Sequence, residues 1–559
     1  MFKALLFPFL SLFFFLSLIG NTIYVPTDFV TIQEAIDAAE NGDIVRVEPG
    51  TYNENILFNG KLITVQSMAG PDVTEIKNPN ESPGMAAVQF INGENDQAIL
   101  DGFSITKTFA CNNIGIKCIS ASPKIINNRI WNFGIIGGTL SYGAAIRLKD
   151  SNAVIENNLI EKNISSNQAG QGFGAGICCY GTGSPTIINN IIRKNYITSS
   201  PYSYHGPSCG AGIASLEEAS PLIMNNIIEE NVNDYDCQVI GKKAKGGGVY
   251  IGGSGAVMFV NNIIRANRAE IEGIVLYADI FGAGIFCENS NAKIQNCVVY
   301  ENIAVVQTSG FRAKGGGIGI TGDCEVVNTI VWGNEATTSD DQIYIYYSGN
   351  PLIRNCCVQD GWPNGEAIIA QDPQFDFTDH SRSAFNLTPL SPCINRGTND
   401  VTLSDDYDGD TRPNMGTIDI GIDEYTGPHA LSATEFTLSE STGGIIDMTL
   451  DAGVENAGRI YLVLAGITAT NPGYILPGGQ TYIPINWDVM TDLGLILLNT
   501  PYMTGFLGYL DPAGQAQAQF DTRGPLDRGV WAGQTLSFAY CLGWPWEFAS
   551  NPVNVLIVP

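Results

Sequence analysis

The stretch GAGICCYGTGSPTIINNIIRKNYI, residues 174–197, contains both of the phrases that recur through the first two thirds of this chain. Its asparagine phrase TIINNII returns as KIINNRI, VIENNLI, LIMNNII, MFVNNII, KIQNCVV, EVVNTIV and LIRNCCV, with a first Asn at positions 127, 157, 189, 225, 261, 296, 328 and 355. Six residues later a second Asn recurs at positions 163, 195, 231, 267, 302 and 334. The glycine phrase GAGICC precedes the asparagine phrase and returns as NIGIKC, GAAIRL, GAGIAS, GGGVYI, GAGIFC and GGGIGI. The two phrases keep a fixed order, which indicates one repeating structural unit.

Each repeat contains three short runs in which apolar residues alternate with others, the period of a β-strand. A unit this small cannot bury its apolar face alone, so successive units must stack and share one core. We therefore predict an all-β fold, a parallel β-helix built of three-strand coils. The first asparagines are predicted to be structural, because Asn tolerates left-handed turn angles and its amide can bond the same group in adjacent coils: Asn127, Asn157, Asn189, Asn225, Asn261, Asn296 and Asn328.

At the front of the repeats, TIQEAIDAAENGDIVRVEPGTYNENI, residues 31–56, predicts a short amphipathic helix opened by Thr31 and followed by a strand and a Pro-Gly turn. The helix is expected to cap the open end of the stack. This opening and the repeats resemble the right-handed parallel β-helix proteins of the pectin-lyase-like superfamily, in their secreted bacterial form with an appended C-terminal β domain. The resemblance covers about residues 22–366 and implies a right-handed solenoid. It implies no single activity, since the superfamily includes lyases, hydrolases, esterases, epimerases and proteins without known catalysis.

The sequence divides into four expected parts. Residues 1–21 resemble an export signal, with Lys3 ahead of an apolar run from Ala4 to Ile19, and an uncleaved anchor is the alternative. The solenoid follows at 22–366, then a turn-rich closing segment at 367–428, then a predicted β-sandwich at 429–559. The mature chain is expected to have no transmembrane span and to be secreted or held at the cell surface, in an extracellular or periplasmic compartment.

The charge and the metal-binding residue types limit the possible partners. With 28 Lys and Arg against 56 Asp and Glu, the net charge of −28 would repel nucleic acid. Thirteen Cys and three His show no spacing typical of zinc sites. Asp406, Asp408 and Asp410 are candidate Ca²⁺ ligands, although Gly409 is misplaced for an EF-hand loop, and a simple Asp-rich turn is the alternative.

The strand that follows each glycine phrase supplies the candidate site. If the first residue of each strand points inward, the second points outward, which predicts an outer row of Lys117, Arg147, Cys178, Ala214, Tyr250, Phe286 and Gly319. Long insertions before the glycine phrases are expected to wall this row into a groove. The predicted substrate-binding residues combine aromatic rings, which stack on sugar faces, with charges that bond hydroxyl or acid groups: Tyr250, Phe286, Glu288, Tyr204, Asp234, Asp236, Arg312 and Lys314. The alternative is that Tyr250 and Phe286 only pack beneath the insertions.

Three functions are compatible with this pattern. The first is binding of carbohydrate or another surface polymer along the coil face. The second is a polysaccharide lyase, with Lys117, Arg147 and Lys149 as a basic patch for an anionic glycan and as candidate catalytic residues. The third is a structural or adhesive spacer. The motifs of the superfamily's polygalacturonases, pectate lyases and alginate epimerases are absent, and the LGWPWEF stretch at 542–548 has Trp544 where pectinesterases have Arg.

Overall fold

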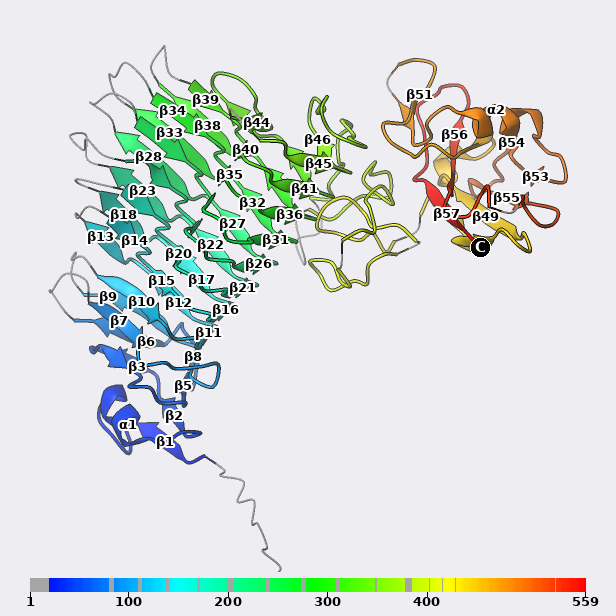
Figure 1. The fold of residues 1–559 in the computed structure, drawn as a ribbon. Helices are drawn as coiled ribbons and strands as arrows, with labels where there is room; N and C mark the ends of the chain where they lie inside the picture. The colour runs from blue at the N-terminus through cyan, green and yellow to red at the C-terminus, as the bar shows by residue number, and fades with distance from the viewer. Residues whose placement is uncertain are drawn as a thin grey trace, which may run out of the picture.

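The computed structural model describes residues 20–559, apart from 80–84, 109–112, 137–139, 168–170, 200–205, 237–241, 273–277, 308–311, 347–348, 378–384 and the single positions 402, 415, 428, 480 and 528. Figure 1 shows a long solenoid of stacked strands, from blue to green, followed by an irregular segment in yellow and a separate group of strands from orange to red. The predicted parallel β-helix is therefore confirmed.

Three parallel sheets run the length of the solenoid. The 12-stranded sheet contains, in spatial order, β1 (Thr22–Val25), β2 (Ile44–Val47), β5 (Thr64–Ser67), β8 (Ile99–Asp101), β11 (Lys124–Ile126), β16 (Val154–Glu156), β21 (Thr186–Ile188), β26 (Leu222–Met224), β31 (Met258–Val260), β36 (Lys293–Gln295), β41 (Glu325–Val327) and β45 (Leu352–Arg354). The 11-stranded sheet contains β3 (Gly50–Tyr52), β6 (Thr74–Asn78), β9 (Ser104–Lys107), β12 (Arg129–Trp131), β17 (Leu159–Glu161), β22 (Ile191–Arg193), β27 (Ile227–Glu229), β32 (Ile263–Arg265), β37 (Val298–Tyr300), β42 (Ile330–Trp332) and β46 (Cys357–Val358). The 10-stranded sheet contains β4 (Ile56–Leu57), β7 (Ala86–Phe90), β10 (Ile114–Ile119), β15 (Ile146–Lys149), β20 (Ile177–Tyr180), β25 (Ile213–Ser215), β30 (Val249–Gly252), β35 (Ile285–Glu288), β40 (Ile318–Thr321) and β44 (Ile343–Ile345).

Two further parallel sheets, which the repeat pattern did not predict, arise from the insertions. The seven-stranded sheet contains β13 (Gly134–Ile136), β18 (Ile164–Asn167), β23 (Tyr196–Ser199), β28 (Val232–Asp236), β33 (Arg268–Glu272), β38 (Ile303–Val306) and β43 (Glu335–Ala336). The six-stranded sheet contains β14 (Leu140–Tyr142), β19 (Gln171–Phe173), β24 (Ser208–Cys209), β29 (Lys242–Lys245), β34 (Ala278–Phe281) and β39 (Arg312–Lys314). The two sheets share a small core of alanines and isoleucines, including Ala244, Ala269, Ile271 and Ile280. The middle coils therefore contain five strands each instead of three.

The main core fills the solenoid between its three long sheets. The first residues of successive strands in the 10-stranded sheet are paired in register and fully buried: Ile146, Ile177, Ile213, Val249, Ile285 and Ile318. The alternation predicted from the sequence is correct here, and Cys118, Cys179 and Cys287 lie in the same core as small apolar residues. At the N-terminal end, helix α1 (Ile32–Ala38) begins with a capping box between Thr31 and Glu34 and buries Ile32, Ala35 and Ile36 in this core.

The repeat pattern assigned two roles, turn geometry and side-chain hydrogen bonding, to the first asparagine of each repeat. In the structure these roles fall on two adjacent positions. Asn127, Asn157 and Asn189 hold left-handed angles at the turn, with φ of 57°, 55° and 57°, and their side chains are exposed. The hydrogen-bonded ladder is built by the next residue, which points inward after the left-handed turn. Asn158 Nδ2 donates to Asn190 Oδ1 (3.0 Å), and the ladder runs through Asn128, Asn158, Asn190, Asn226 and Asn262. The predicted asparagine ladder is therefore confirmed, but most of it lies one residue after the Asn127 series, in which Asn328 Nδ2 donates to Asn296 Oδ1 (3.5 Å).

A second ladder is formed by the asparagines six residues after the first series. It connects Asn163, Asn195, Asn231, Asn267, Asn302 and Asn334 through side-chain hydrogen bonds of 2.9–3.0 Å. The same order of residues recurs, because Lys162 and Lys194 hold left-handed angles directly ahead of Asn163 and Asn195. Both ladders satisfy buried amide groups in every coil they cross, which fixes the register of the stack.

The C-terminal part contains two larger sheets and one small one. The four-stranded sheet is ordered β47 (Leu431–Ala433), β49 (Ile445–Asp451), β55 (Gln515–Asp521), β53 (Met503–Thr504); the five-stranded sheet is ordered β48 (Thr437–Ser439), β57 (Val553–Val558), β56 (Thr535–Leu542), β50 (Ile460–Gly466), β54 (Leu507–Tyr509). Strands β51 (Tyr474–Ile475) and β52 (Tyr482–Ile483) form a hairpin, and the helices are η1 (Val454–Asn456) and α2 (Val489–Ile496). One apolar cluster contains Met448 and Phe520 from the first sheet and Phe538 and Val555 from the second, so these two sheets share a core.

Candidate functional site on the outer face of the solenoid

Strand pairing aligns the outer row as the repeat predicts. Lys117 lies opposite Arg147, Arg147 opposite Cys178, and Tyr250 opposite Phe286. These side chains alternate with the buried core residues of the same strands. The row therefore lies on the outer face of the 10-stranded sheet.

The centre of this row is covered by protein, which corrects the predicted groove at that point. Tyr250 is 7% exposed and Phe286 is 1% exposed. Both belong to an apolar cluster with Phe173 and Phe281 of the six-stranded sheet. The insertions fold back as strands because left-handed glycines such as Gly282 reverse the chain between the two sheets. Tyr250 and Phe286 thus pack beneath the insertions, and their ring faces are not open to solvent.

The six-stranded sheet contributes a second row, which we call the facing row. Its members are paired in register and consist of aromatic and basic residues with one cysteine: Tyr142, Phe173, Cys209, Lys245, Phe281 and Lys314. Phe281 lies against Phe286 with ring centroids 5.8 Å apart, and Phe173 lies 6.3 Å from Tyr250. The two sheets are therefore joined by an aromatic layer.

Four tyrosines at the borders of this layer are half-buried and keep part of their surface open, and we call them the tyrosine edge: Tyr142, Tyr180, Tyr344 and Tyr346. Tyr142 stacks on Tyr180 with ring centroids 4.5 Å apart and planes at 13°. Tyr346 lies 4.5 Å from Phe281, and Tyr344 lies 5.8 Å from the same ring. Half-buried, rigid aromatic rings are suited to contact a ligand because their positions are already fixed.

A hydrogen-bonded cluster crosses between the two sheets at the middle of the layer. Lys245 Nζ lies 2.5 Å from Glu288 Oε1, and Tyr250 Oη donates to Glu288 Oε2 (2.6 Å). Burial, together with Cys209 and Glu288, raises the pKa of Tyr250 far above its usual range. The tyrosine therefore remains protonated, and Lys245 and Glu288 form an ion pair between the two sheets.

Other cations lie over the rings of the tyrosine edge. Lys314 Nζ is 4.5 Å from the Tyr344 ring centroid and forms an ion pair with Asp340 (3.1 Å). Lys243 Nζ is 5.7 Å from the ring of Tyr346. Each arrangement places positive charge beside an aromatic face, where the ring quadrupole attracts it.

The predicted basic patch lies on β10 and β15 and adjoins the tyrosine edge. Arg147 Nε donates to the carbonyl oxygen of Tyr142 (2.7 Å), and Lys149 is paired in register with Tyr180. Burial, followed by repulsion from Arg147, lowers the pKa of Lys117. Burial also lowers the pKa of Arg147, which is largely enclosed. The structure therefore brings Lys117, Arg147 and Lys149 together, and it places Tyr142 and Tyr180 beside them.

The remaining predicted binding residues are dispersed. Asp234 lies in β28 of the seven-stranded sheet, where its carboxylate accepts a hydrogen bond from Tyr196. Asp236 lies in the same strand, and Tyr204 lies outside the described residues. Arg312 forms an exposed ion pair with Asp279 (2.9 Å), and this hydrogen bond raises the pKa of Arg312. Asp234 and Asp236 therefore lie on a different sheet from Tyr250.

The acidic turn at residues 406–410 is built as a structural turn. Asp406 is buried, and its Oδ1 accepts the backbone N–H groups of Asp408 and Asp410 at 2.8 Å. Its Oδ2 accepts the backbone N–H of Glu424 (2.8 Å). Both oxygens of Asp406 thus accept hydrogen bonds from backbone N–H groups, whereas in a calcium site they would coordinate the cation. No group of three His, Cys, Asp or Glu suited to a metal ion occurs within the described part of the chain. The hypothesis of Ca²⁺ ligation by Asp406, Asp408 and Asp410 is not supported.

Comparison with known proteins agrees with the fold. Residues 112–311 match the family model described as right handed beta helix region, so this part of the solenoid is right-handed. No curated protein matches the chain. Among solved structures, the complex of XylC with xylose is similar at 11% sequence identity and a TM-score of 0.32, covering 89% of this chain and 99% of that chain. We draw nothing about function from so low a score. No helix among the described residues is long and apolar enough to cross a membrane.

Proposed function

We propose that this chain binds an acidic carbohydrate polymer along the line where the 10-stranded and six-stranded sheets meet. The observation that supports the proposal is the tyrosine edge, whose rings are fixed by packing and accompanied by cations on a strongly acidic protein. The four tyrosines form two pairs at the two ends of the layer, because the strands β25, β30, β35 and β40 lie between Tyr180 on β20 and Tyr344 on β44. An extended polymer is therefore the ligand that would contact both pairs. Tyrosine faces contact sugar rings, and the cations attract their acid groups.

The cations differ in how far their charge is already neutralised. Lys245, Lys314 and Arg312 form ion pairs with carboxylates. Within the described residues, Lys117 and Lys243 have no carboxylate within ion-pair distance. We therefore infer that Lys117 and Lys243, with Arg147 beside Lys117, provide the charge that a bound polyanion would meet.

Affinity electrophoresis in gels containing polygalacturonate tests the proposal. The protein should be retarded, and the retardation should decrease as salt is raised because the exposed charges are screened. Replacing Tyr344 and Tyr346 by Ala should reduce binding at least several-fold, and Lys243→Ala should weaken the salt dependence. Tyr509→Ala, which removes an exposed tyrosine of the C-terminal part, is the matched control. Unchanged binding in the double variant would exclude the tyrosine edge as the binding surface.

A second function, polysaccharide lyase activity, is favoured by one observation, the lowered pKa of Lys117 beside Arg147. A lysine with a lowered pKa is closer to serving as a general base, and a neighbouring arginine can neutralise a uronate. Absorbance of unsaturated ends during incubation with uronate polymers tests this function. If activity is lost in Lys117→Ala and kept in Lys124→Ala, Lys117 is the catalytic base. The absence of both activity and binding would favour the structural spacer.

We further propose the organisation expected from the sequence. Residues 1–21 act as an export signal, and the protein is secreted or surface-held. Helix α1 caps the solenoid, because its apolar side packs into the first coils. The two larger C-terminal sheets form the β-sandwich of 429–559, after the closing segment 367–428. N-terminal sequencing of the exported protein should begin near Asn21, and an intact N-terminus on the exported protein would contradict the signal.

A further inference from the structure

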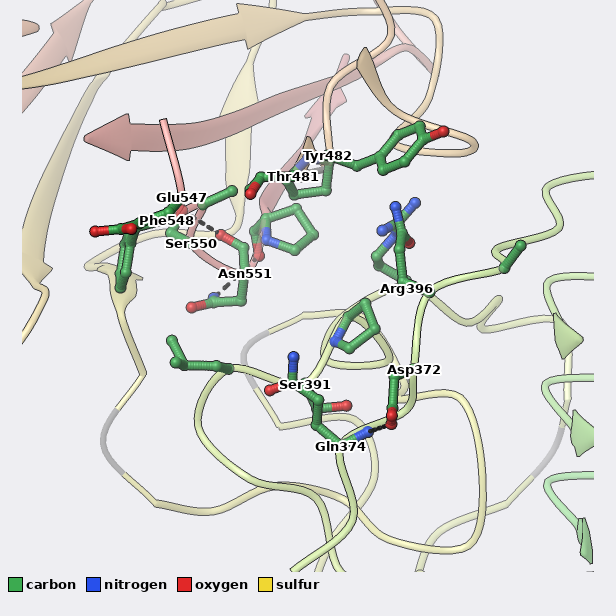
Figure 2. Close-up of a pocket in the computed structure, with 17 residues that line it drawn as sticks. Asp372, Gln374, Ser391, Arg396, Thr481, Tyr482, Glu547, Phe548, Ser550 and Asn551 are labelled. Carbon is green, nitrogen blue, oxygen red and sulfur yellow. Dashed lines mark hydrogen bonds between the residues drawn. The ribbon is translucent and has the colours of Figure 1, made fainter. Parts of the chain in front are cut away.

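A cleft of about 460 Å³ lies between the closing segment and the C-terminal sheets. Figure 2 shows Asp372, Gln374, Ser391 and Arg396 on one side, and Thr481, Tyr482 and the stretch 547–551 on the other. Its volume falls within the ~300–1,000 Å³ typical of small-molecule sites. The cleft is separate from the tyrosine edge, and no motif in the sequence indicates it because its walls are far apart in the chain.

Among the described residues, Arg396 is the only cation that lines this cleft, and it is buried, with 3% of its surface exposed. Its Nη2 donates to the carbonyl oxygens of Thr470 (2.9 Å) and Pro472 (3.4 Å), whereas its buried Nε has no hydrogen-bond partner. In the part of the chain that the structure describes, no carboxylate lies within ion-pair distance of the guanidinium. Burial lowers the pKa of Arg396 to about 10. A buried guanidinium charge without a counter-ion raises the free energy of the folded protein, and a bound anion would offset this increase.

Further polar atoms at this junction also lack partners. The Oε1 atom of Gln371, which lines the cleft, and the Oδ1 atom of Asn471, whose Nδ2 donates to the carbonyl oxygen of Arg396, are buried without a hydrogen bond. Buried unsatisfied groups in native proteins usually bind water or a ligand. The cleft therefore offers one hydroxyl-binding acceptor, Gln371 Oε1, as well as the positive charge of Arg396.

The other side chains of the cleft suit a sugar ring. Tyr482 is 39% exposed and Phe548 lines the opposite side, so an aromatic face is available at the wall. Glu547, the acidic side chain of the 547–551 stretch, forms an ion pair with Arg459 (3.1 Å), which reduces its repulsion of an anion. Asp372 accepts the backbone N–H of Gln374 (2.8 Å).

We propose that this cleft binds one carboxylate-bearing sugar unit, a uronate, with Arg396 as the partner of its carboxylate and Tyr482 against its ring. The site acts independently of the tyrosine edge, because the two share no residue and lie on different parts of the chain. A protein with both sites would hold an acidic glycan along the solenoid and a single acidic unit at the junction.

Calorimetric titration of the full chain with the monosaccharide galacturonate tests the site. The chain should bind galacturonate at least tenfold more tightly than galactose, which has the same ring without the carboxylate. Arg396→Gln should abolish this preference, whereas Arg523→Gln, an exposed arginine paired with Asp521, should leave it unchanged. Because Arg396 is buried and could be needed for folding, Leu390→Trp provides a second variant that fills the cleft from an exposed position and keeps the arginine.

Each outcome of this titration is decisive. Loss of galacturonate binding in Leu390→Trp, with an unchanged unfolding temperature, supports the site. Equal affinity for inorganic phosphate and galacturonate would show a bare anion site and overturn the assignment to a sugar. Equal affinity for galactose would overturn the role of Arg396. Absence of any binding would show that only ordered water satisfies the junction. Since Tyr344 and Tyr346 take no part, their double variant should bind galacturonate normally even if polymer binding fails.

Discussion

Single asparagines decide the register of the solenoid. In the turns of the two ladders, a residue with left-handed angles precedes an inward asparagine, and amides such as that of Asn195 bond both the coil below and the coil above. Asn195, for example, donates to Asn231 Oδ1 (3.0 Å) and accepts from Asn163 Nδ2 (2.9 Å). Two adjacent positions therefore have distinct physical roles, one in backbone geometry and one in hydrogen bonding.

Replacing Asn195 by Ala should destabilise the protein, because it leaves buried donors and acceptors in two neighbouring coils without partners. We expect a loss on the order of 1–3 kcal/mol in the free energy of unfolding. Asn189→Gly, at an exposed left-handed position, should change the stability by less than about 1 kcal/mol. Urea unfolding measures both, and equal losses would contradict the division of roles.

The ion pair between the two outer sheets is a second test at the level of single residues. Glu288→Gln removes the negative partner of Lys245, whose side chain is largely buried. The lysine would then lose its ion-pair partner in an enclosed site, and we expect a loss of about 1–3 kcal/mol, below the value for a fully buried pair because Glu288 is partly exposed. Arg312→Gln breaks an exposed pair and should cost about 0–1 kcal/mol. Thermal unfolding distinguishes the two variants.

At the level of elements, the insertions form two sheets where the sequence predicted loops. The glycine phrases make this possible, since Gly282 adopts φ of 62° and brings β34 back against the outer face of the 10-stranded sheet. An added Cβ at Gly282 would lie 2.1 Å from the carbonyl oxygen of Ile285. The turn between the two sheets therefore requires glycine for space as well as for backbone angle.

Gly282→Ala should accordingly be more harmful than the same change at Gly458, which has φ of 75° and where an added Cβ would meet no atom within 4 Å. Both variants carry the strain of a left-handed alanine, on the order of 1 kcal/mol. Only Gly282→Ala adds a steric clash, so its unfolding temperature should fall several degrees further. A similar fall for the two variants would show that the close approach at Gly282 is relieved easily.

The sequence could predict the repeat, the strand alternation and the outer row, because a buried face that repeats in every coil leaves a periodic pattern. It could not predict the two extra sheets, since strands such as VNDYD at β28 and RAEIE at β33 are short and rich in charges. The apolar residues of β33, Ala269 and Ile271, pack in a small core with many alanines. The burial of Tyr250 depends on these sheets, so the predicted groove failed for the same reason.

At the level of the whole molecule, the closing segment joins the solenoid to the C-terminal sheets. Asn261 donates to the carbonyl oxygen of Asp405 (3.2 Å), and Asn328 both donates to Thr398 (3.0 Å) and accepts from it (2.8 Å). On the opposite side, Asn554 donates to the carbonyl oxygen of Asn395 (3.0 Å). The upper members of the exposed asparagine series thus become buried docking points, which a repeat pattern alone does not distinguish from Asn127 or Asn157.

Carboxylates buried in the closing segment should make the stability depend on pH. Burial raises the pKa of Asp423 to about 7, although the carboxylate accepts the backbone N–H of Leu387 (2.8 Å). An unfolded aspartate titrates near ~3.9, so between about pH 4 and 7 the folded state binds more protons than the unfolded state. The contribution of Asp423 to the free energy of unfolding is therefore largest below about pH 4. This contribution decreases as the pH rises to 7, by an amount on the order of 1–3 kcal/mol. Asp423→Asn should flatten this part of the pH profile, whereas Asp72→Asn, at an exposed turn, should leave it unchanged. Thermal unfolding between pH 4 and 8 measures the effect, and a profile that rises with pH in all three proteins would show that Asp423 is ionised in the folded chain.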